Sequence, residues 1–228
     1  MNSKKIIVAL DSNNINKVKE LTKLIKNEVF AFKIGYEFFF NFGIDGYKQI
    51  KKICPKIFLD LKLHDIPNTV QQGIKAIEKL RPVFTTIHIS GGDEMIKSSI
   101  INRKYTKILG VSVLTSLNTK QINKYYNENS IEKIVKKFVK YATKYKLDGI
   151  VCSPKEIEIV RKEIGKKFTI VTPGIRPEMH NSFFDDQKRI LTPKKAIDLG
   201  ANFLVIGRPI TESKNPLDTI KQINSSLN

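Results

Sequence analysis

Short runs of β-branched and aromatic residues recur at fairly even intervals along the chain, and amphipathic segments separate them. In the segment from Ile131 to Val139, for example, apolar residues stand at helical spacing. We predict eight strands: Ile6–Leu10, Phe30–Ile34, Ile57–Leu63, Phe84–Ile89, Ile108–Leu114, Gly149–Cys152, Phe168–Thr172 and Phe203–Gly207. Eight strand–helix alternations in 228 residues indicate an α/β fold, a parallel (β/α)8 barrel of the TIM type. A doubly wound open sheet is the alternative.

One domain covering residues 1–228 is the simplest organisation, because no Pro/Gly/Ser-rich linker or low-complexity tract interrupts the pattern. Hydrophobic residues make up 41% and charged residues 27%, an ordinary globular composition, and no apolar run is long enough to cross a bilayer. The first apolar run ends at Asp11 and is too short for a secretion signal. We therefore expect a cytoplasmic protein that does not bind membranes.

The formal net charge of +18 raises the question of a nucleic-acid partner. However, only six of the 40 basic residues are Arg, the side chain best suited to reading phosphates and bases. The lysines are spread along the chain on expected outer helix faces, as at Lys133, Lys136, Lys137 and Lys140. We expect a solvated basic surface that helps attract an anionic substrate, and no nucleic-acid partner. A non-enzymatic nucleic-acid binder is the alternative from another class.

Polar residues gather where the predicted strands end. In a parallel barrel the carboxyl ends of all strands lie on one face, and enzymes of this fold build their active sites there. The residues at these ends are Asp11, Lys33, His88, Ser90, Thr115, Ser116, Pro173, Gly174, Gly207 and Arg208. This regular bias predicts one site on that face.

The third predicted strand carries the strongest chemical signal. Its sequence continues from Ile57 to Thr69 as IFLDLKLHDIPNT. Because side chains alternate along a strand, Leu59, Leu61 and Leu63 share one side, while Asp60 and Lys62 share the other. We expect the leucines to pack against helices and the two charged groups to point into the barrel mouth.

A salt bridge that merely stabilises the barrel is the alternative explanation for Asp60 and Lys62. Buried charges lose hydration energy that their mutual attraction often only just offsets, so stabilisation is a weak reason to place them there. Asp65 adds a third charge where the strand turns into a loop, and Pro67 suits a helix start. We therefore favour a catalytic interpretation.

The segment DLKLHDIPNT resembles the signature of the orotidine 5′-phosphate decarboxylases, and the likeness extends over nearly the full chain. The matching segments follow in the family's order: VALD with Asp11, FKIG with Lys33, HIS with His88, VLTS with Thr115 and Ser116, TPGIRP with Pro173 and Arg176, DQKR with Gln187, and IGRPI with Gly207 and Arg208. The resemblance implies a TIM-barrel lyase that converts orotidine 5′-phosphate to uridine 5′-phosphate in de novo pyrimidine biosynthesis. It also implies that no cofactor and no metal take part.

Carried over to this sequence, the resemblance implies an array of alternating charges formed by Lys33, Asp60, Lys62 and Asp65. Lys62 would protonate the carbanion at C6 of the pyrimidine. Asp65 and Thr69 would reach into the site of a neighbouring subunit, so the functional unit would be a homodimer.

The resemblance also implies contacts to the rest of the nucleotide. Asp11 and Lys33 would hold the ribose hydroxyls. Thr115 and Ser116 would meet the pyrimidine edge, although capping of a turn explains their hydroxyls nearly as well. Contacts to the phosphate side would come from Arg176, Gln187, Gly207 and Arg208. The further substrate-binding positions are Leu61, Leu63, His64, Ile66, Pro67, Asn68 and Pro173.

The segment from Arg176 to Arg189 is expected to be a lid over the substrate, with an ordinary disordered surface loop as the alternative. His88 is expected to be a hydrogen-bonded packing residue and not a catalytic one. A rival within the superfamily, the magnesium-dependent sugar-phosphate enzymes, keeps the DxKxxD pattern. Those enzymes carry an acidic residue near the second strand, where this chain has Lys33.

Overall fold

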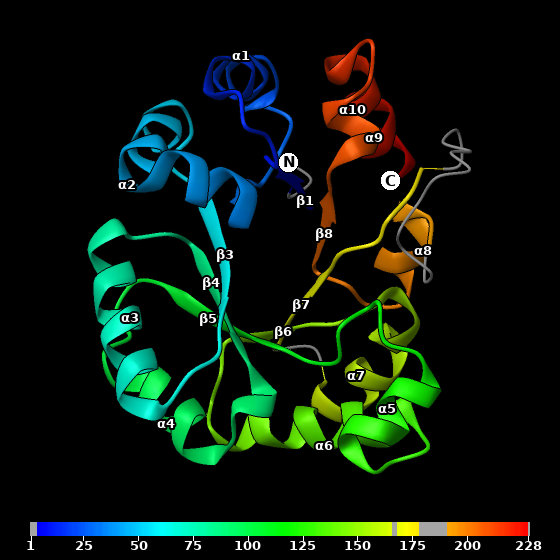
Figure 1. Ribbon diagram of the computed structural model, residues 1–228. Coiled ribbons are helices and arrows are strands. Elements are labelled where there is room, and N and C mark those ends of the chain that lie inside the picture. Colours follow the sequence, from blue (N-terminus) through cyan, green and yellow to red (C-terminus); the bar gives the residue numbers. More distant parts are fainter. Residues whose placement is uncertain (1–3, 166–167, 178–190, 228) are drawn as a thin grey trace.

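The computed structural model describes residues 4–165, 168–177 and 191–227. Eight parallel strands follow one another around a closed barrel in chain order, with helices outside them (Figure 1). The strands are β1 (Ile6–Ala9), β2 (Ala31–Ile34), β3 (Ile57–Leu63), β4 (Phe84–His88), β5 (Lys107–Val111), β6 (Gly149–Val151), β7 (Thr169–Thr172) and β8 (Phe203–Ile206). β8 pairs with β1, which closes the barrel. The predicted (β/α)8 barrel is thereby confirmed over the doubly wound alternative.

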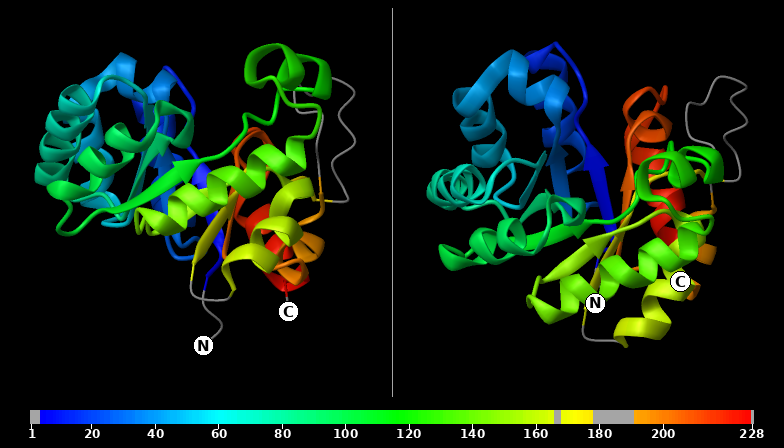
Figure 2. Two further views of the ribbon diagram at one scale, coloured as in Figure 1. Left: turned by 90° about the horizontal axis from the view of Figure 1, so that it is seen from below. Right: turned by 60° about the horizontal axis from the view of Figure 1, so that its bottom comes forward.

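Helices connect successive strands and cover the outside of the barrel, as the two further views show (Figure 2). They are α1 (Ile15–Ile25), α2 (Tyr36–Ile53), α3 (Pro67–Leu80), α4 (Asp93–Ile101), α5 (Thr119–Tyr126), α6 (Ile131–Lys144), α7 (Ile157–Ile164), α8 (Pro193–Asp198), α9 (Arg208–Thr211) and α10 (Pro216–Ser226). Two short 3-10 helices, η1 (Ile89–Gly91) and η2 (Pro154–Glu156), follow β4 and β6. α2 is kinked at Gly43, where φ is 57°.

The predicted strand boundaries differ most from those of the structure at the fifth strand, which we expected to continue to Leu114. β5 ends at Val111, and Leu117 N donates to the carbonyl of Leu114 at 3.0 Å, which closes a turn. Val113 is buried without belonging to a strand. An apolar run can thus leave the sheet and remain in the core, so hydrophobicity alone extended the prediction too far.

The alternation of side chains along the strands separates two apolar cores. One lies between the barrel and its helices and includes Ile6, Val8, Phe32 and Leu59. The other fills the barrel interior and consists of Ile7, Ala9, Ala31, Phe58, Phe84, Leu109, Val171 and Val205. Neighbouring positions on one strand therefore belong to different layers, as the pleat requires.

Continuing the inward alternation toward the carboxyl ends leads from apolar to charged and polar side chains. Inward Ala9 is followed by Asp11, Ala31 by Lys33, and Phe58 by Asp60. The candidate site therefore rests directly on the barrel's apolar interior. The opposite end of the barrel is filled by the rings of Phe30, Phe84 and Phe203, whose centroids lie 4.1–6.0 Å apart.

The helix surfaces follow the predicted division between apolar and basic faces. In α6 the apolar positions Ile134, Val135, Phe138 and Val139 are buried. Lys133, Lys137 and Lys140 on the same helix are exposed, as expected for solvated lysines. Within the described ranges, none of the helices combines the length and apolar character needed to cross a bilayer.

Candidate active site

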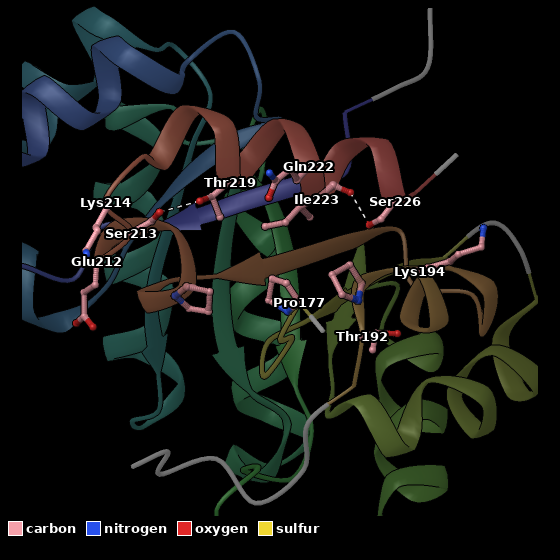
Figure 3. A pocket seen from close by; sticks show the side chains of 12 residues that line it. Pro177, Thr192, Lys194, Glu212, Ser213, Lys214, Thr219, Gln222, Ile223 and Ser226 are labelled. Atoms are coloured by element: carbon pink, nitrogen blue, oxygen red, sulfur yellow. Dashed lines mark hydrogen bonds between the residues drawn. The ribbon is translucent and has the colours of Figure 1, made fainter. Parts of the chain in front are cut away.

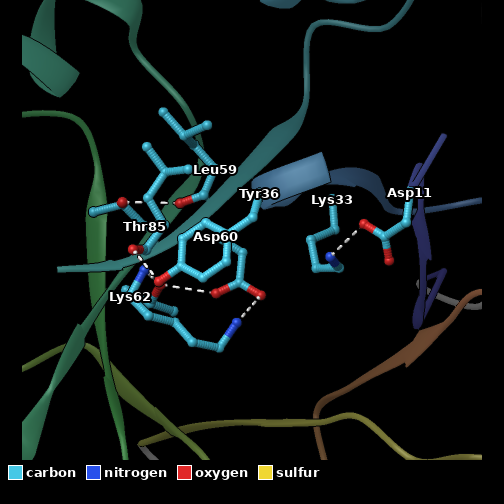
Figure 4. Close-up of polar contacts among 9 residues, drawn as sticks. Asp11, Lys33, Tyr36, Leu59, Asp60, Lys62 and Thr85 are labelled. Carbon is cyan, nitrogen blue, oxygen red and sulfur yellow. Dashed lines mark hydrogen bonds and ion pairs between the residues drawn. The ribbon is translucent and has the colours of Figure 1, made fainter. Parts of the chain in front are cut away.

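β3 carries an ion pair at the barrel mouth. Lys62 Nζ donates to Asp60 Oδ2 at 2.8 Å, and Asp60 is 8% exposed. Figure 4 shows this pair beside Lys33 and Asp11, from the neighbouring strands β2 and β1. Leu61 and Leu63 pack against the outer core together with Leu59. The two sides of β3 are thus used as the alternation predicts.

The strand is irregular at Lys62. Its φ of 43° lies in the left-handed region, which is costly for a residue with a side chain, and the pairing of β3 with β4 shifts register between Leu59 and Leu63. Lys62 N donates to Thr86 Oγ1 at 2.9 Å, and the Tyr36 hydroxyl donates to the carbonyl of Leu61 at 3.1 Å. Side chains from β4 and α2 therefore support the bulge on both sides.

A second ion pair joins β2 to the end of β1. Lys33 Nζ lies 3.1 Å from Asp11 Oδ1, and the Lys33 side chain is 12% exposed. Gly35 makes room for this contact: a Cβ there would lie 2.7 Å from Lys33 Nζ and 3.1 Å from Asp11 Oδ1. Any other residue at this position would push the ammonium away from its carboxylate. Lys33 and Asp11 therefore form an ion pair between neighbouring strands, and both side chains lie at the barrel mouth.

The surrounding cations keep Asp60 ionised. Burial alone would raise the pKa of Asp60. The ammonium groups of Lys33 and Lys62, with hydrogen bonds from Lys62 and Thr86, outweigh burial and lower that pKa below its ordinary value. Asp60 is therefore a carboxylate at neutral pH, and it lies between two cations.

His88 stands inward on β4, near these charges. Its ring centroid lies 5.2 Å from that of the exposed His64. Burial, followed by the nearby His64 and Lys62, lowers the pKa of His88 to about 4, although Asp60 acts in the opposite direction. His88 is therefore a neutral imidazole at physiological pH, and its packing role stays a prediction.

Asp65 does not join the charged cluster within one chain. It is exposed, and its Oδ1 accepts a hydrogen bond from the backbone N–H of Ile66 at 2.7 Å. Among the ion pairs of the described residues, none includes Asp65. Pro67 is the first residue of α3, as predicted, and Asn68 and Thr69 lie exposed on its first turn.

The described residues that follow β7 contact the chain again at Leu191. Pro173 and Gly174 follow the strand, and Gly174 has a φ of 76°. Arg176 N donates to the carbonyl of Leu191 at 3.0 Å, so both ends of the intervening segment are held together. The predicted contact Gln187 and the greater part of the predicted lid, through Arg189, lie outside the described residues.

The chain after β8 turns at Gly207 into the short helix α9. The carbonyl of Gly207 accepts a hydrogen bond from Ile210 N at 2.8 Å, and Arg208 is exposed at the first position of α9. A short extra helix after the eighth strand is a common phosphate-binding element of this fold. Gly207 and Arg208 thus stand on the same face as the charged cluster.

Thr115 and Ser116 lie in the turn after β5. They line a cavity together with Glu156 of η2 and Ile131 of α6. This placement is compatible with both explanations of their hydroxyls, contact with a ligand and capping of a turn.

A further cavity of about 640 Å³ lies between α8, α9 and α10 (Figure 3). Its lining includes Thr192, Glu212, Thr219 and Gln222, and none of those predicted site residues that the structure describes is part of it. In the described part of the chain, no group of three or more His, Cys, Asp or Glu side chains is arranged to hold a metal ion.

The sequence interpretation missed three residues beside the ion pairs. Thr86 bonds both Asp60 and the backbone of Lys62, Tyr36 bonds the carbonyl of Leu61 between them, and Gly35 leaves room for the pair of Lys33 and Asp11. Thr86 could have been found, because it stands two residues before His88 on the inward side of β4. The contacts of Tyr36 depend on how α2 packs beside β3, which no local pattern reveals.

Comparison with known proteins gives consistent results. The family described as "Orotidine 5'-phosphate decarboxylase / HUMPS family" matches residues 4–223. A Wolbachia pipientis (strain wPip) protein named orotidine 5'-phosphate decarboxylase is 44% identical over 224 residues, covering 97% of this chain and 98% of the relative. A relative of the same name from Ehrlichia canis is 44% identical over 225 residues, covering 98% and 97%.

A solved structure is also similar over its full length. The crystal structure of orotidine 5'-phosphate decarboxylase from Lactobacillus acidophilus has a TM-score of 0.83 and 38% sequence identity to this chain. The match covers 99% of each chain.

Proposed function

The chain belongs to the orotidine 5'-phosphate decarboxylase / HUMPS family, and we propose that it decarboxylates orotidine 5′-phosphate to uridine 5′-phosphate. The names of its full-length relatives support this branch of the family. The observation that carries the proposal is the array at the barrel mouth, where Asp60 lies between the cations Lys62 and Lys33. A cation at position 33 also fits a pyrimidine enzyme better than a sugar-phosphate enzyme that holds magnesium with an acidic residue there.

Lys62 is the proposed proton donor. When the bond between C6 and the carboxylate breaks, the electron pair stays on C6 and CO2 leaves. The pyrimidine ring delocalises that pair poorly, so a fixed ammonium beside C6 is a substantial source of stabilisation. At ~4 Å and an effective dielectric constant of about 20, such a charge contributes roughly 4 kcal/mol. Lys62 then transfers a proton to C6 and regains one from solvent.

Asp60 has two functions in this proposal. Its carboxylate pairs with the Lys62 ammonium at 2.8 Å and orients it. It also faces the departing carboxylate of the substrate. This chemistry needs no electron sink, and we propose that the reaction proceeds without cofactor or metal.

The remaining groups bind the rest of the nucleotide. Asp11 and Lys33, joined at 3.1 Å, offer an acceptor and a donor to the ribose hydroxyls. Arg208 and the backbone at Gly207 bind the phosphate, assisted by Arg176 and Gln187 from the loop after β7. Pro173, Thr115 and Ser116 complete the pyrimidine side.

We propose that two subunits complete each site. Among the ion pairs of the described residues none includes Asp65, which lies exposed in the loop that follows β3. The adjoining rim is apolar: Tyr36, Phe40 and Ile44 of α2 are 50%, 78% and 49% exposed, and Ile66 is 67% exposed. Burying this surface against a second copy would bring Asp65 and Thr69, with the segment from His64 to Asn68, to the partner's Lys62.

We propose that the protein acts in the cytoplasm as a single barrel domain that covers residues 1–228. Its substrate is an anionic nucleotide, and the net charge of +18 favours the approach of such a molecule. Nucleic acid and membranes are not among the proposed partners.

The first test is direct assay of chelator-treated protein. We expect loss of orotidylate absorbance with production of one CO2 per uridine 5′-phosphate, at the same rate before and after chelation. Activity that disappears with chelator and returns with magnesium would contradict the cofactor-free mechanism. Turnover of a sugar phosphate with no turnover of orotidylate would instead place the chain in the rival branch.

The second test is Lys62→Ala, compared with Lys133→Ala on the exposed face of α6. We expect Lys62→Ala to fold and bind uridine 5′-phosphate but to lose turnover by at least about a thousandfold, because both the charge at C6 and its proton donor are removed. Lys133→Ala should behave as wild type. Near-normal turnover by Lys62→Ala, measured by absorbance, would reject its role.

The third test is Arg208→Ala, with Arg81→Ala at the end of α3 as a control. Loss of a charged contact to phosphate should raise the Michaelis constant by about 10- to 100-fold, with less effect on kcat. Steady-state kinetics separates the two constants. An unchanged Michaelis constant would exclude Arg208 from the phosphate site.

The fourth test combines two inactive subunits. A Lys62→Ala subunit and an Asp65→Asn subunit are co-expressed with different tags, and the mixed dimer is purified through both. If Asp65 acts across the interface, one of the two sites is intact and about half of wild-type activity returns. If Asp65 serves its own chain, both sites of the mixed dimer stay damaged and no activity returns.

A further inference from the structure

The Thr86 hydroxyl connects the side chain of Asp60 to the backbone of Lys62. Its Oγ1 donates to Asp60 Oδ1 at 2.8 Å and accepts from Lys62 N at 2.9 Å. Thr86 is fully buried on β4, and Asp60 Oδ2 is bound by Lys62 Nζ at 2.8 Å. One hydroxyl thus closes a ring of hydrogen bonds with both members of the central ion pair.

The direction of each hydrogen bond in this ring is determined by its partners. A backbone N–H can only donate, so Thr86 must accept from Lys62 N. An ionised carboxylate can only accept, so the hydroxyl proton must point to Asp60. This arrangement favours the ionised form of Asp60. If Asp60 Oδ1 carried a proton, two donors would face each other in the hydrogen bond from Thr86, which needs an acceptor at that position.

The same hydroxyl supports an uncommon backbone conformation. Lys62 has a φ of 43°, and the register of β3 against β4 changes between Leu59 and Leu63. A non-glycine residue in this region costs about 1–3 kcal/mol and persists where surrounding contacts hold it. The hydrogen bond from Lys62 N to Thr86 is such a contact. Thr86 therefore holds the backbone from which the Lys62 side chain extends, and it also contacts Asp60, the counterion of Lys62.

We propose that Thr86 is a positioning residue for catalysis, which holds the Lys62 bulge in place and orients the Asp60 carboxylate beside the Lys62 ammonium. The catalytic part of this inference rests on the proposed function. Thr86 itself does not contact the substrate in this arrangement. Its effect reaches the reaction through Lys62 and Asp60.

The electrostatic surroundings of Asp60 come from several elements. Lys62 on β3 and Lys33 on β2 lower its pKa, and the Thr86 hydrogen bond adds to them, against the effect of burial. Tyr36 of α2 and the neutral His88 of β4 also face this group, and Lys33 is shared with Asp11 at the end of β1. Loss of the Thr86 hydroxyl removes its hydrogen bonds to Asp60 and to the backbone of Lys62, so a change in the titration of Asp60 would report on both contacts.

Thr85 provides a matched control on the same strand. Like Thr86 it is fully buried, and its Oγ1 donates to the carbonyl of Leu59 at 2.9 Å. It contacts neither member of the ion pair through that bond. Thr85→Val and Thr86→Val therefore remove one buried hydroxyl each with the same change of shape, and they differ in whether the removed group touches the catalytic pair.

The kinetic experiment compares Thr86→Val, Thr86→Ser and Thr85→Val across a pH series. For Thr86→Val we expect kcat to fall by about 10- to 100-fold, as for a lost hydrogen bond to a charged group, with little change in the Michaelis constant. Because removal of the bond raises the pKa of Asp60, the acid-side loss of kcat/KM should move to higher pH. Thr86→Ser keeps the hydroxyl and should restore both properties, while Thr85→Val should lower Tm without moving the pH profile.

A second measurement does not depend on activity. The side-chain carboxyl carbon of Asp60 is followed by NMR in ligand-free wild type, Thr86→Val and Thr85→Val. We expect Asp60 to titrate at higher pH in Thr86→Val and at an unchanged pH in Thr85→Val. Should Thr86→Val not fold, Thr86→Cys replaces it, because a thiol of similar size is a much weaker donor.

The outcomes separate the two proposals. Absence of orotidylate turnover in wild type would overturn the proposed function, while the Asp60 titration would still test the effect of Thr86. A purely structural role would appear as equal losses of Tm in the two valine variants with unchanged pH profiles and titrations. That result, or a Thr86→Val enzyme with wild-type kcat, would overturn the inference.

Discussion

The ion pair of a lysine ammonium with a carboxylate, Lys62 with Asp60, at the edge of an apolar barrel interior is the constraint on which the rest of the site depends. Below it lies the inner core that includes Phe58 and Phe84, where an isolated charge would be strongly unfavourable. Asp60 compensates that charge at 2.8 Å, and Lys33 and Thr86 in turn keep Asp60 ionised. Removing one partner of a buried pair leaves the other uncompensated. The charged residues on β2 and β3 are therefore interdependent, because each one compensates the charge of its neighbour.

The barrel solves this problem by giving β1, β2 and β3 two functions along their length. Their inward positions are apolar and fill the interior up to Ala9, Ala31 and Phe58, whereas the next inward positions, Asp11, Lys33 and Asp60, carry charge. β3 shows the change within three alternating residues, from Phe58 to Asp60 to Lys62. Because the scaffold is rigid below the site, the charged groups are held in place before substrate binds, which is the basis of electrostatic catalysis.

The predictable part of the site follows from local periodicity. The alternation in β3 indicated which side of the strand Asp60 and Lys62 occupy, and the family resemblance supplied their proposed roles. The bulge at Lys62 was not predictable from that pattern, because a regular strand would show the same alternation of apolar and charged residues. Its support comes from Thr86, 24 residues along the chain, and from Tyr36 on the other side. Likewise, the apolar run from Ile108 to Leu114 predicted a longer strand, since burial of Val113 outside the sheet has the same hydrophobic signature.

The amino-acid sequence by itself determined the order of strands and helices, the face on which the site lies and the identity of its charged residues. These features depend on periods of two and 3.6 residues, and such periods are written locally in the chain. Tertiary structure alone decided the distances between those charges, the ionisation of Asp60 and the exposure of Asp65. These properties depend on the dielectric surroundings and on contacts between residues far apart in the chain, which exist only after the barrel has closed.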